Sequence, residues 1–243
     1  MSKELQVFIE DIQKKEKDFE KFLPKKSDVD INKFIKLAKM TLINHPYIFS
    51  RDRNSLMKAL IDCATFGLYP DSKEAALVPV GREVLFMPMI GGILKRLRAA
   101  KNISNILCDT VTHKELKENC FTYDTIDGVE QLSHRRLMTE KRMQKENIAI
   151  VYAQIIYSDR PDKPVEIVDI EMLEQIKKGK DRAGSPWDKF FYRMAQKTAI
   201  KGLIRKVSLE GVDFHDLLQK DDDLLMLKKE YDALQKEKVC EDL

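Results

Sequence analysis

The sequence predicts an α+β fold: N-terminal helices, a small antiparallel or mixed β-sheet with a packed central helix, a long basic helix and a C-terminal helix. Three patterns indicate this class. Apolar residues recur with a helical period over residues 1–66, strand-like patterns dominate between residues 75 and 169, and the helical period returns from residue 186. A chain of 243 residues with 43% hydrophobic residues can bury a sizeable core without disulfides or metals.

The N-terminal part is expected to form three helices, over residues 1–23, 31–44 and 54–66. Asp30 is placed to cap the second helix, and His45-Pro46 should end it because the residue before a proline avoids helical backbone angles. Gly67 follows the third helix as a C-terminal glycine.

The central part is expected to begin with a β-hairpin, residues 75–80 and 83–87, around Gly81-Arg82. The apolar face of Ile90, Ile93, Leu94 and Leu97 predicts the central helix over residues 90–101. The remaining elements are assigned in chain order: strands at 106–113, 120–124, 148–158 and 165–169, a polar loop at 128–147, and a short helix at 170–177.

A long basic helix is predicted over residues 186–207. Ser185 can cap it, and Pro186 suits its first position. A last helix, over residues 214–239, carries most of the acidic tail.

Several classes of protein are excluded by what the sequence lacks. It has no run of eighteen apolar residues for a membrane span, and its charged N-terminus does not suit a signal peptide. Its four cysteines and four histidines are scattered, which indicates reduced thiols rather than a zinc site or a disulfide framework. No GxxxxGK[ST] loop is present to bind ATP phosphates.

Charge is distributed unevenly along the chain. The 43 Lys and Arg nearly balance the 40 Asp and Glu, but residues 177–206 hold ten basic against two acidic residues, and residues 207–243 hold five against eleven. Such an asymmetry indicates a polyanion partner for the basic block.

Five cations repeat every fourth residue along the basic helix: Lys189, Arg193, Lys197, Lys201 and Arg205. Cations at this spacing repel one another, so a stripe of five is not chosen for helix stability. It rises ~6 Å per step and suits the phosphates of a nucleic-acid strand. Lys206 and a second cluster on the central helix, Lys95, Arg96 and Arg98, extend the predicted contacts. The alternative is a solvated charged face without a ligand.

Other candidate sites are weaker. Trp187 is expected to anchor the basic helix rather than stack on a base. Arg135-Arg136 and Lys141-Arg142 could touch a nucleic-acid backbone, but a mobile surface loop is the simpler interpretation. For a metal-dependent nuclease, Asp169 and Glu171 could hold Mg²⁺, yet Glu83-Val84-Leu85 lacks the lysine of a common nuclease motif. No Ser/His/Asp or Cys/His set is suggested.

The ordered motifs of residues 60–206 resemble the RecT family of phage single-strand annealing recombinases. They are Phe66-Gly67-Leu68-Tyr69-Pro70-Asp71, Ala76-Leu77-Val78-Pro79-Val80-Gly81, the stretch 85–93 with Gly92 and Arg98, Val151-Tyr152-Ala153, and Ser185-Pro186-Trp187-Asp188 with Met194 and Lys197-Thr198. The family has Gly-aromatic-Lys-Gly before its central helix, where this chain has Met89-Ile90-Gly91-Gly92. We expect Lys95 or Arg96, one turn later, to replace the missing lysine.

The resemblance implies ATP-independent annealing of single-stranded DNA in homologous recombination, without catalysis, by a ring-shaped or filamentous homo-oligomer. It implies no cofactor, with Mg²⁺ as a modulator of annealing, and as partners single-stranded DNA, the annealed duplex, a phage exonuclease and a single-strand-binding protein. It also implies the cytoplasm of a bacterial host as the location and no membrane partner. The alternatives are a protein that protects single strands without pairing them, and a Mg-dependent nuclease.

Three segments follow from this reading. Residues 1–50 are expected to make subunit contacts, residues 51–207 to bind and anneal DNA, and residues 208–243 to form an acidic helical tail. The predicted DNA contacts are Lys95, Arg96, Arg98, Lys189, Arg193, Lys197, Lys201, Arg205 and Lys206, and Gly92, Pro186 and Trp187 are expected to be structural.

Overall fold

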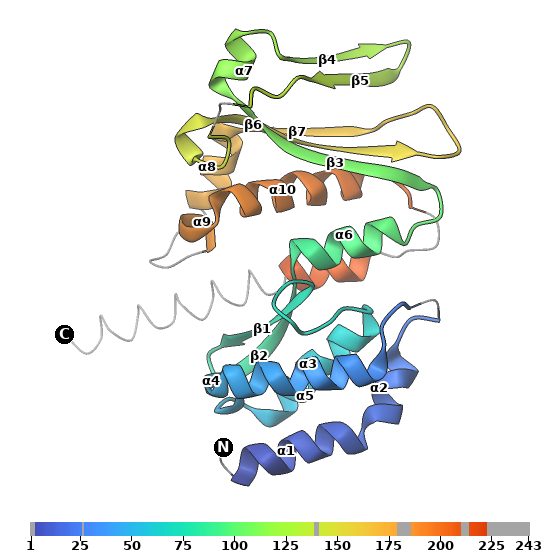
Figure 1. Ribbon diagram of the computed structural model, residues 1–243, viewed down its shortest axis with the longest axis vertical. Coiled ribbons are helices and arrows are strands. Elements are labelled where there is room, and N and C mark those ends of the chain that lie inside the picture. The colour runs from blue at the N-terminus through green and yellow to red at the C-terminus, as the bar shows by residue number, and fades with distance from the viewer. Residues whose placement is uncertain (1–2, 26, 139–140, 179–185, 210–213, 223–243) are drawn as a thin grey trace, which may run out of the picture. The chain divides into compact units, whose positions relative to one another are not determined.

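The computed structural model describes residues 3–25, 27–138, 141–178, 186–209 and 214–222 (Figure 1). The predicted α+β class is confirmed, and the sheets in this part of the chain are small and antiparallel. The chain divides into two compact units, residues 1–95 with 213–243 and residues 96–212. The three functional segments with boundaries at 50 and 207 stay a prediction. None of the described helices is long and apolar enough to cross a membrane.

Unit 1, residues 1–95 with 213–243, starts with five helices: α1 (Lys3–Lys14), α2 (Glu16–Phe22), α3 (Ile31–Asn44), α4 (Pro46–Phe49) and α5 (Arg53–Thr65). The predicted helix over 31–44 and its Asp30 cap are confirmed, since the Asp30 carboxylate accepts a hydrogen bond from the Lys33 N–H. The prediction of one helix over 1–23 is wrong, because the helix is interrupted at Lys15. Phe19 on α2 packs into the core, with its ring centroid 5.5 Å from that of Phe34.

The predicted hairpin of unit 1 consists of β1 (Ala75–Val80) and β2 (Glu83–Pro88). Its turn uses Gly81, whose φ of 59° lies in the left-handed region that glycine adopts readily. Helix α5 packs on β2, and the rings of Phe66 and Phe86 stack 5.3 Å apart. The predicted C-terminal helix is present over residues 215–222, and the rest of the tail lies outside the described residues.

The start of helix α6 (Ile90–Arg98) lies against the backbone that precedes β1. A β-carbon at Gly91 would lie 2.6 Å from the carbonyl oxygen of Lys73, and one at Gly92 would overlap the carbonyl oxygen of Glu74. Only glycine fits at these two positions without a backbone shift. The lysine that the RecT pattern places at residue 91 is therefore sterically excluded in this chain.

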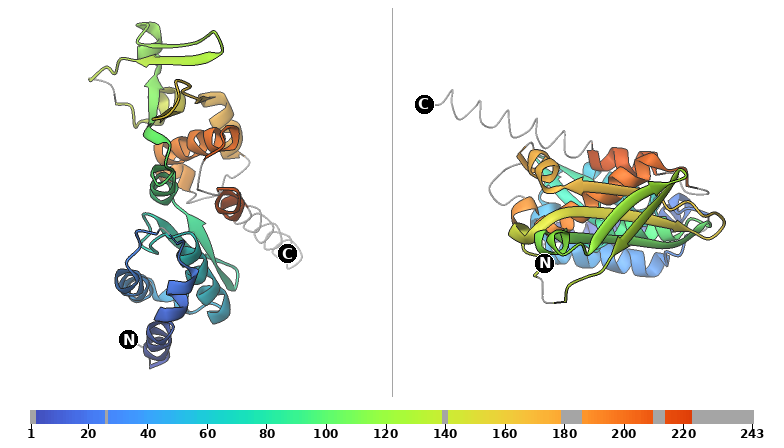
Figure 2. Two further views of the ribbon diagram at one scale, coloured as in Figure 1. Left: turned by 90° about the vertical axis from the view of Figure 1, so that its right-hand side faces the viewer. Right: turned by 90° about the horizontal axis from the view of Figure 1, so that it is seen from above.

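Unit 2, residues 96–212, is built on a three-stranded sheet in the order β3–β6–β7, formed by β3 (Ile103–Thr112), β6 (Ile148–Tyr157) and β7 (Val165–Asp169). Helix α10 (Phe191–Lys206) packs on one face of this sheet. The hairpin of β4 (Phe121–Ile126) and β5 (Val129–His134) lies on the other, as both Figure 1 and Figure 2 show.

Two predictions for unit 2 are corrected. The polar stretch 128–147 is not all loop, because residues 129–134 form β5 in register with β4 and residues 145–147 form a short 3-10 turn. The basic helix is not continuous from 186 to 207. It is interrupted at Phe190, which separates α9 (Pro186–Lys189) from α10. Helices α7 (His113–Lys117) and α8 (Ile170–Lys178) complete the unit.

We predict that Gly92→Ala destabilises the protein by about 1–3 kcal/mol, because the added methyl group meets backbone rather than a movable side chain. Urea unfolding followed by circular dichroism measures the change. Arg98→Ala, at an exposed position of the same helix, is the matched control and should change stability by less than ~0.5 kcal/mol. Equal stability of Gly92→Ala and wild type would contradict the close approach.

Candidate nucleic-acid interface

Small residues bring helix α10 close to the sheet of unit 2. Ala195 and Ala199 are fully buried, and Gly202 lies against the side chain of Glu166 on β7. A larger side chain at these positions would hold the helix away from the strands. The close packing fixes which arc of the helix faces the sheet and which faces away from it.

The cations on the arc that faces away from the sheet differ in exposure. Arg193 and Arg205 are exposed, whereas Lys197 and Lys201 are only 8% and 7% exposed. The alternative of a solvated charged face therefore does not hold for these two lysines, and their role as DNA contacts stays a prediction. Ile200 and Ile204, which lie beside them on the helix, are buried as well, so this stretch of the arc is covered rather than solvated. Neither lysine is without an interaction partner.

The ends of the basic region are held in different ways. At the start, Trp187 is buried with its ring centroid 5.6 Å from that of Phe191, and its anchoring role stays a prediction. Of Pro186 and Lys189 the structure describes the backbone only, in α9. At the other end, Lys206 forms an ion pair with Glu166, and the hydrogen bond between them raises the pKa of the Lys206 ammonium.

The three predicted contacts on α6 are not equivalent. The Lys95 ammonium lies 3.0 Å from a carboxylate oxygen of Glu74, 3.2 Å from one of Asp28, and 4.7 Å from the ring centroid of Tyr69. It is therefore paired with acids of unit 1, and its expected role in place of the lysine missing at residue 91 stays a prediction. Arg96 is half-buried and Arg98 is exposed.

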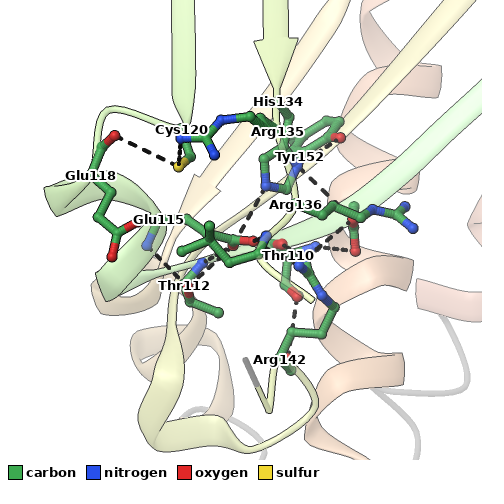
Figure 3. A network of polar contacts seen from close by, with 12 residues as sticks. Thr110, Thr112, Glu115, Glu118, Cys120, His134, Arg135, Arg136, Arg142 and Tyr152 are labelled. Carbon is green, nitrogen blue, oxygen red and sulfur yellow. Dashed lines mark hydrogen bonds and ion pairs between the residues drawn. The ribbon is translucent and has the colours of Figure 1, made fainter. Parts of the chain in front are cut away.

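A buried polar network on the hairpin side of the sheet was not predicted (Figure 3). Asp109 and Glu115 are 3% and 0% exposed, and Arg142 lies 2.6 Å from a Glu115 oxygen and 3.5 Å from an Asp109 oxygen. Arg136 pairs with Asp109 at 2.5 Å. His134 lies between the acids with its Nδ1 3.2 Å from the Tyr152 hydroxyl.

The network also determines local structure. Thr112 and Glu115 form a reciprocal capping box at the start of α7, and a second Glu115 oxygen accepts a hydrogen bond from the Leu137 N–H. The stretch that follows β5 is thus tied to β3 and α7. The Thr112-x-x-Glu115 spacing is a helix-start signal that could have revealed part of this from sequence.

The pKa values in the network follow from its contacts. Burial raises the pKa of Glu115, but hydrogen bonds from Thr112, Leu137 and Arg142 outweigh it and lower the pKa to about 2. Burial, with the nearby Asp109, raises the pKa of Tyr152 to about 12.

Asp169, one of the two acidic residues considered for a nuclease, has a structural partner. An Asp169 oxygen accepts a hydrogen bond from the Met172 N–H at 2.6 Å, at the start of α8. Within the described ranges, no group of three His, Cys, Asp or Glu side chains could hold a metal ion. Cys63, Cys108 and Cys120 are free thiols, as expected, and Cys240 lies outside those ranges.

We predict that acid destabilises the protein partly through Glu115. Its folded pKa of about 2 lies below its ordinary value of 4.5, so its stabilising contribution is complete above pH 4.5 and is lost as the pH falls towards 2. Denaturation at a series of pH values should show this loss in wild type. In Glu115→Gln, which is less stable at neutral pH, the decline between pH 4.5 and 2 should be shallower, and identical slopes would contradict the prediction.

Comparison with known proteins agrees with these features. The model of the RecT family matches residues 32–236, most of the chain. Curated proteins gave no match. Because a single family model covers the basic helix, the central helix and the strands between them, the chain belongs to the RecT family of single-strand annealing recombination proteins, which are non-catalytic.

Proposed function

We propose that this protein holds single-stranded DNA along the outward arc of α10 and pairs it with a complementary strand without ATP. The observation that carries the proposal is the pair of exposed arginines, Arg193 and Arg205, on a helix whose opposite arc is fixed to the sheet. Twelve residues separate them, a rise of ~18 Å. This length spans several phosphates of an extended strand.

The binding energy would come from phosphates. Each phosphate that a Lys or Arg neutralises releases condensed counterions, which gives strong, salt-sensitive binding without sequence preference. Base pairing supplies the specificity, so the protein needs contacts to the backbone rather than to base edges. Bases left unread by the protein stay available to the incoming strand.

The proposed contacts form two groups, which differ in how exposed the side chains are. Arg193, Arg205 and Arg98 are exposed in the structure, and Lys206 is 59% exposed beside Glu166. Lys197 and Lys201 can contact a DNA strand only after the groups that bury them move away. Lys95 can do so only after its ion pair with Glu74 breaks. Arg96 and Lys189 are proposed contacts too, and the half-buried Arg96 belongs to the second group with the buried lysines.

Subunit contacts by residues 1–50 form part of the same proposal. Val7, Met40, Ile43 and Tyr47, from α1, α3 and α4, are about half exposed although they are large and apolar. A hollow of about 610 Å³ nearby is lined by Leu5, Pro46 and Phe49, among others. An exposed apolar surface with a hollow suits a second copy of the chain in a ring or filament.

The cellular setting is proposed on the same basis. We place the protein in the cytoplasm of a bacterial host, with a phage exonuclease that exposes single strands and a single-strand-binding protein as partners. It needs no nucleotide cofactor, and Mg²⁺ would modulate annealing by screening the two strands.

We predict that Arg193→Glu with Arg205→Glu weakens binding of an oligo-dT strand by at least about tenfold and flattens its salt dependence. Fluorescence anisotropy at several salt concentrations measures both. The matched control is Lys17→Glu with Lys36→Glu, two exposed lysines of unit 1, which changes the net charge equally and should keep wild-type affinity. An equal loss in both variants would indicate a general charge effect and would contradict an α10 interface.

We also predict that the protein accelerates pairing of complementary oligonucleotides added one after the other, without any nucleotide, and that ATP leaves the rate unchanged. Gel electrophoresis of labelled strands follows duplex formation. Slower pairing than in buffer would indicate a protective single-strand-binding protein instead. Shortened strands in the presence of Mg²⁺ would indicate a nuclease.

A further inference from the structure

Arg136 and Arg142, from the segment between β5 and β6, lie on the face of the unit 2 sheet opposite α10, whereas Lys145 of the same segment lies over the ring of Phe191 on α10. Cys108 on β3 faces α10, because its thiol contacts the Gln196 carbonyl oxygen. Side chains alternate along a strand, so Asp109 points to the other face, where Arg136 and Arg142 meet it. Arg136 and Arg142, which follow β5, therefore lie on the face of the sheet opposite α10, the face on which the β4–β5 hairpin also lies (Figure 3).

This segment is held in place although it carries little regular structure. Arg142 donates hydrogen bonds to Glu115 and to the carbonyl oxygen of Thr110, and its own carbonyl oxygen accepts one from the Thr110 hydroxyl. Releasing a buried carboxylate from its arginine costs about 3–5 kcal/mol. These interactions therefore fix the position of the segment, and with it the position of its exposed side chains.

The outer surface combines cations with exposed apolar side chains. Met138 and Met143 are 94% and 63% exposed, and the side chain of Arg136 is 61% exposed. With Lys141, also exposed, and other residues of the segment they line a hollow of about 480 Å³. The two acids that pair with the arginines are buried, whereas the Arg136 side chain and Lys141 are exposed.

We propose that this hollow is a second DNA site, which captures the incoming single strand before it pairs. A phosphate would lie against Arg136 and Lys141, and a base against the flexible apolar side chains of Met138 and Met143, the combination that single-stranded nucleic acids favour. This inference rests on the proposed function of α10. Capture on a different face of the sheet raises the local concentration of the second strand while keeping two polyanions farther apart than the ~8–10 Å over which salt screens them.

The observations favour a nucleotide over a peptide. One hollow is lined by both cations, Arg136 and Lys141, and apolar side chains, Met138 and Met143, and a nucleotide presents a phosphate and a base to match these two kinds of group. The family to which the chain belongs already has single-stranded DNA as its ligand.

The test uses Lys141→Glu combined with Met138→Ser. Neither side chain takes part in the Arg136–Asp109 or Arg142–Glu115 pairs, so the variant should melt at the wild-type temperature. Lys141→Gln with Met143→Ser is the milder second variant. The matched reference is Arg193→Glu with Arg205→Glu on the opposite face.

Full-length protein is first saturated with an unlabelled oligo-dT strand, and uptake of a labelled oligo-dT strand, which cannot pair with it, is then measured by anisotropy. We expect first-strand affinity within about twofold of wild type. Second-strand uptake should fall at least about fivefold, its salt slope should decrease by about one, and annealing of complementary strands should slow.

Unchanged second-strand uptake in both variants would overturn the inference and leave the hollow to a protein partner. An equal loss of first- and second-strand binding would also overturn it, because the hollow would then belong to the first site. Wild-type protein that binds the first strand but takes up no second strand refutes this inference alone. Failure to bind the first strand refutes the proposed function together with it.

Discussion

The close packing of α10 on the sheet of unit 2 is the constraint on which the rest of the unit depends. Ala195, Ala199 and Gly202 let the helix axis approach the strands, and Glu166 fills the space beside Gly202. The rotation of the helix is thereby fixed, and with it the arc on which every cation of the helix lies. Because a one-residue change of helix phase turns side chains by ~100°, the small residues decide the electrostatics of the outer surface as much as the lysines and arginines do.

The cations of α10 differ in how accessible they are to a ligand, because Lys197 and Lys201 are buried whereas Arg193 and Arg205 are exposed. An ammonium group removed from water loses several kcal/mol of hydration unless other groups replace it, so both lysines are held where partners compensate them. Exposed arginines at the two ends carry no such constraint from burial. A DNA strand that first contacts Arg193 and Arg205 would then have to compete with the existing partners of the two lysines. Each phosphate that binds a lysine would therefore add less binding free energy than each of the first two phosphates.

What the sequence could and could not predict follows from the range of the interactions involved. Helix α3 and strand β7 begin and end where the sequence predicts, because a local cap at Asp30 and a local run of β-branched residues define them. The exposure of Lys197 was not predictable, since what covers a helix face is decided by tertiary packing. The stretch 128–147 was misjudged for the same reason: its arginines look solvated in sequence, and the buried Asp109 that holds them is more than twenty-five residues away.

Annealing requires two like-charged strands to meet, and the two faces of one small sheet offer a way to manage their repulsion. The cations of α10 are fixed from one side by packing, and those of the segment after β5 are fixed from the other by buried acids. The arrangement after β5 has the larger desolvation cost, because two carboxylates are buried in it. It nevertheless positions arginine side chains on a stretch with little regular secondary structure. Since base pairing supplies the recognition, neither face has to read sequence. A non-catalytic protein can then promote pairing by lowering the repulsion alone, and the energy it contributes is bounded by the phosphates it can neutralise before the duplex leaves.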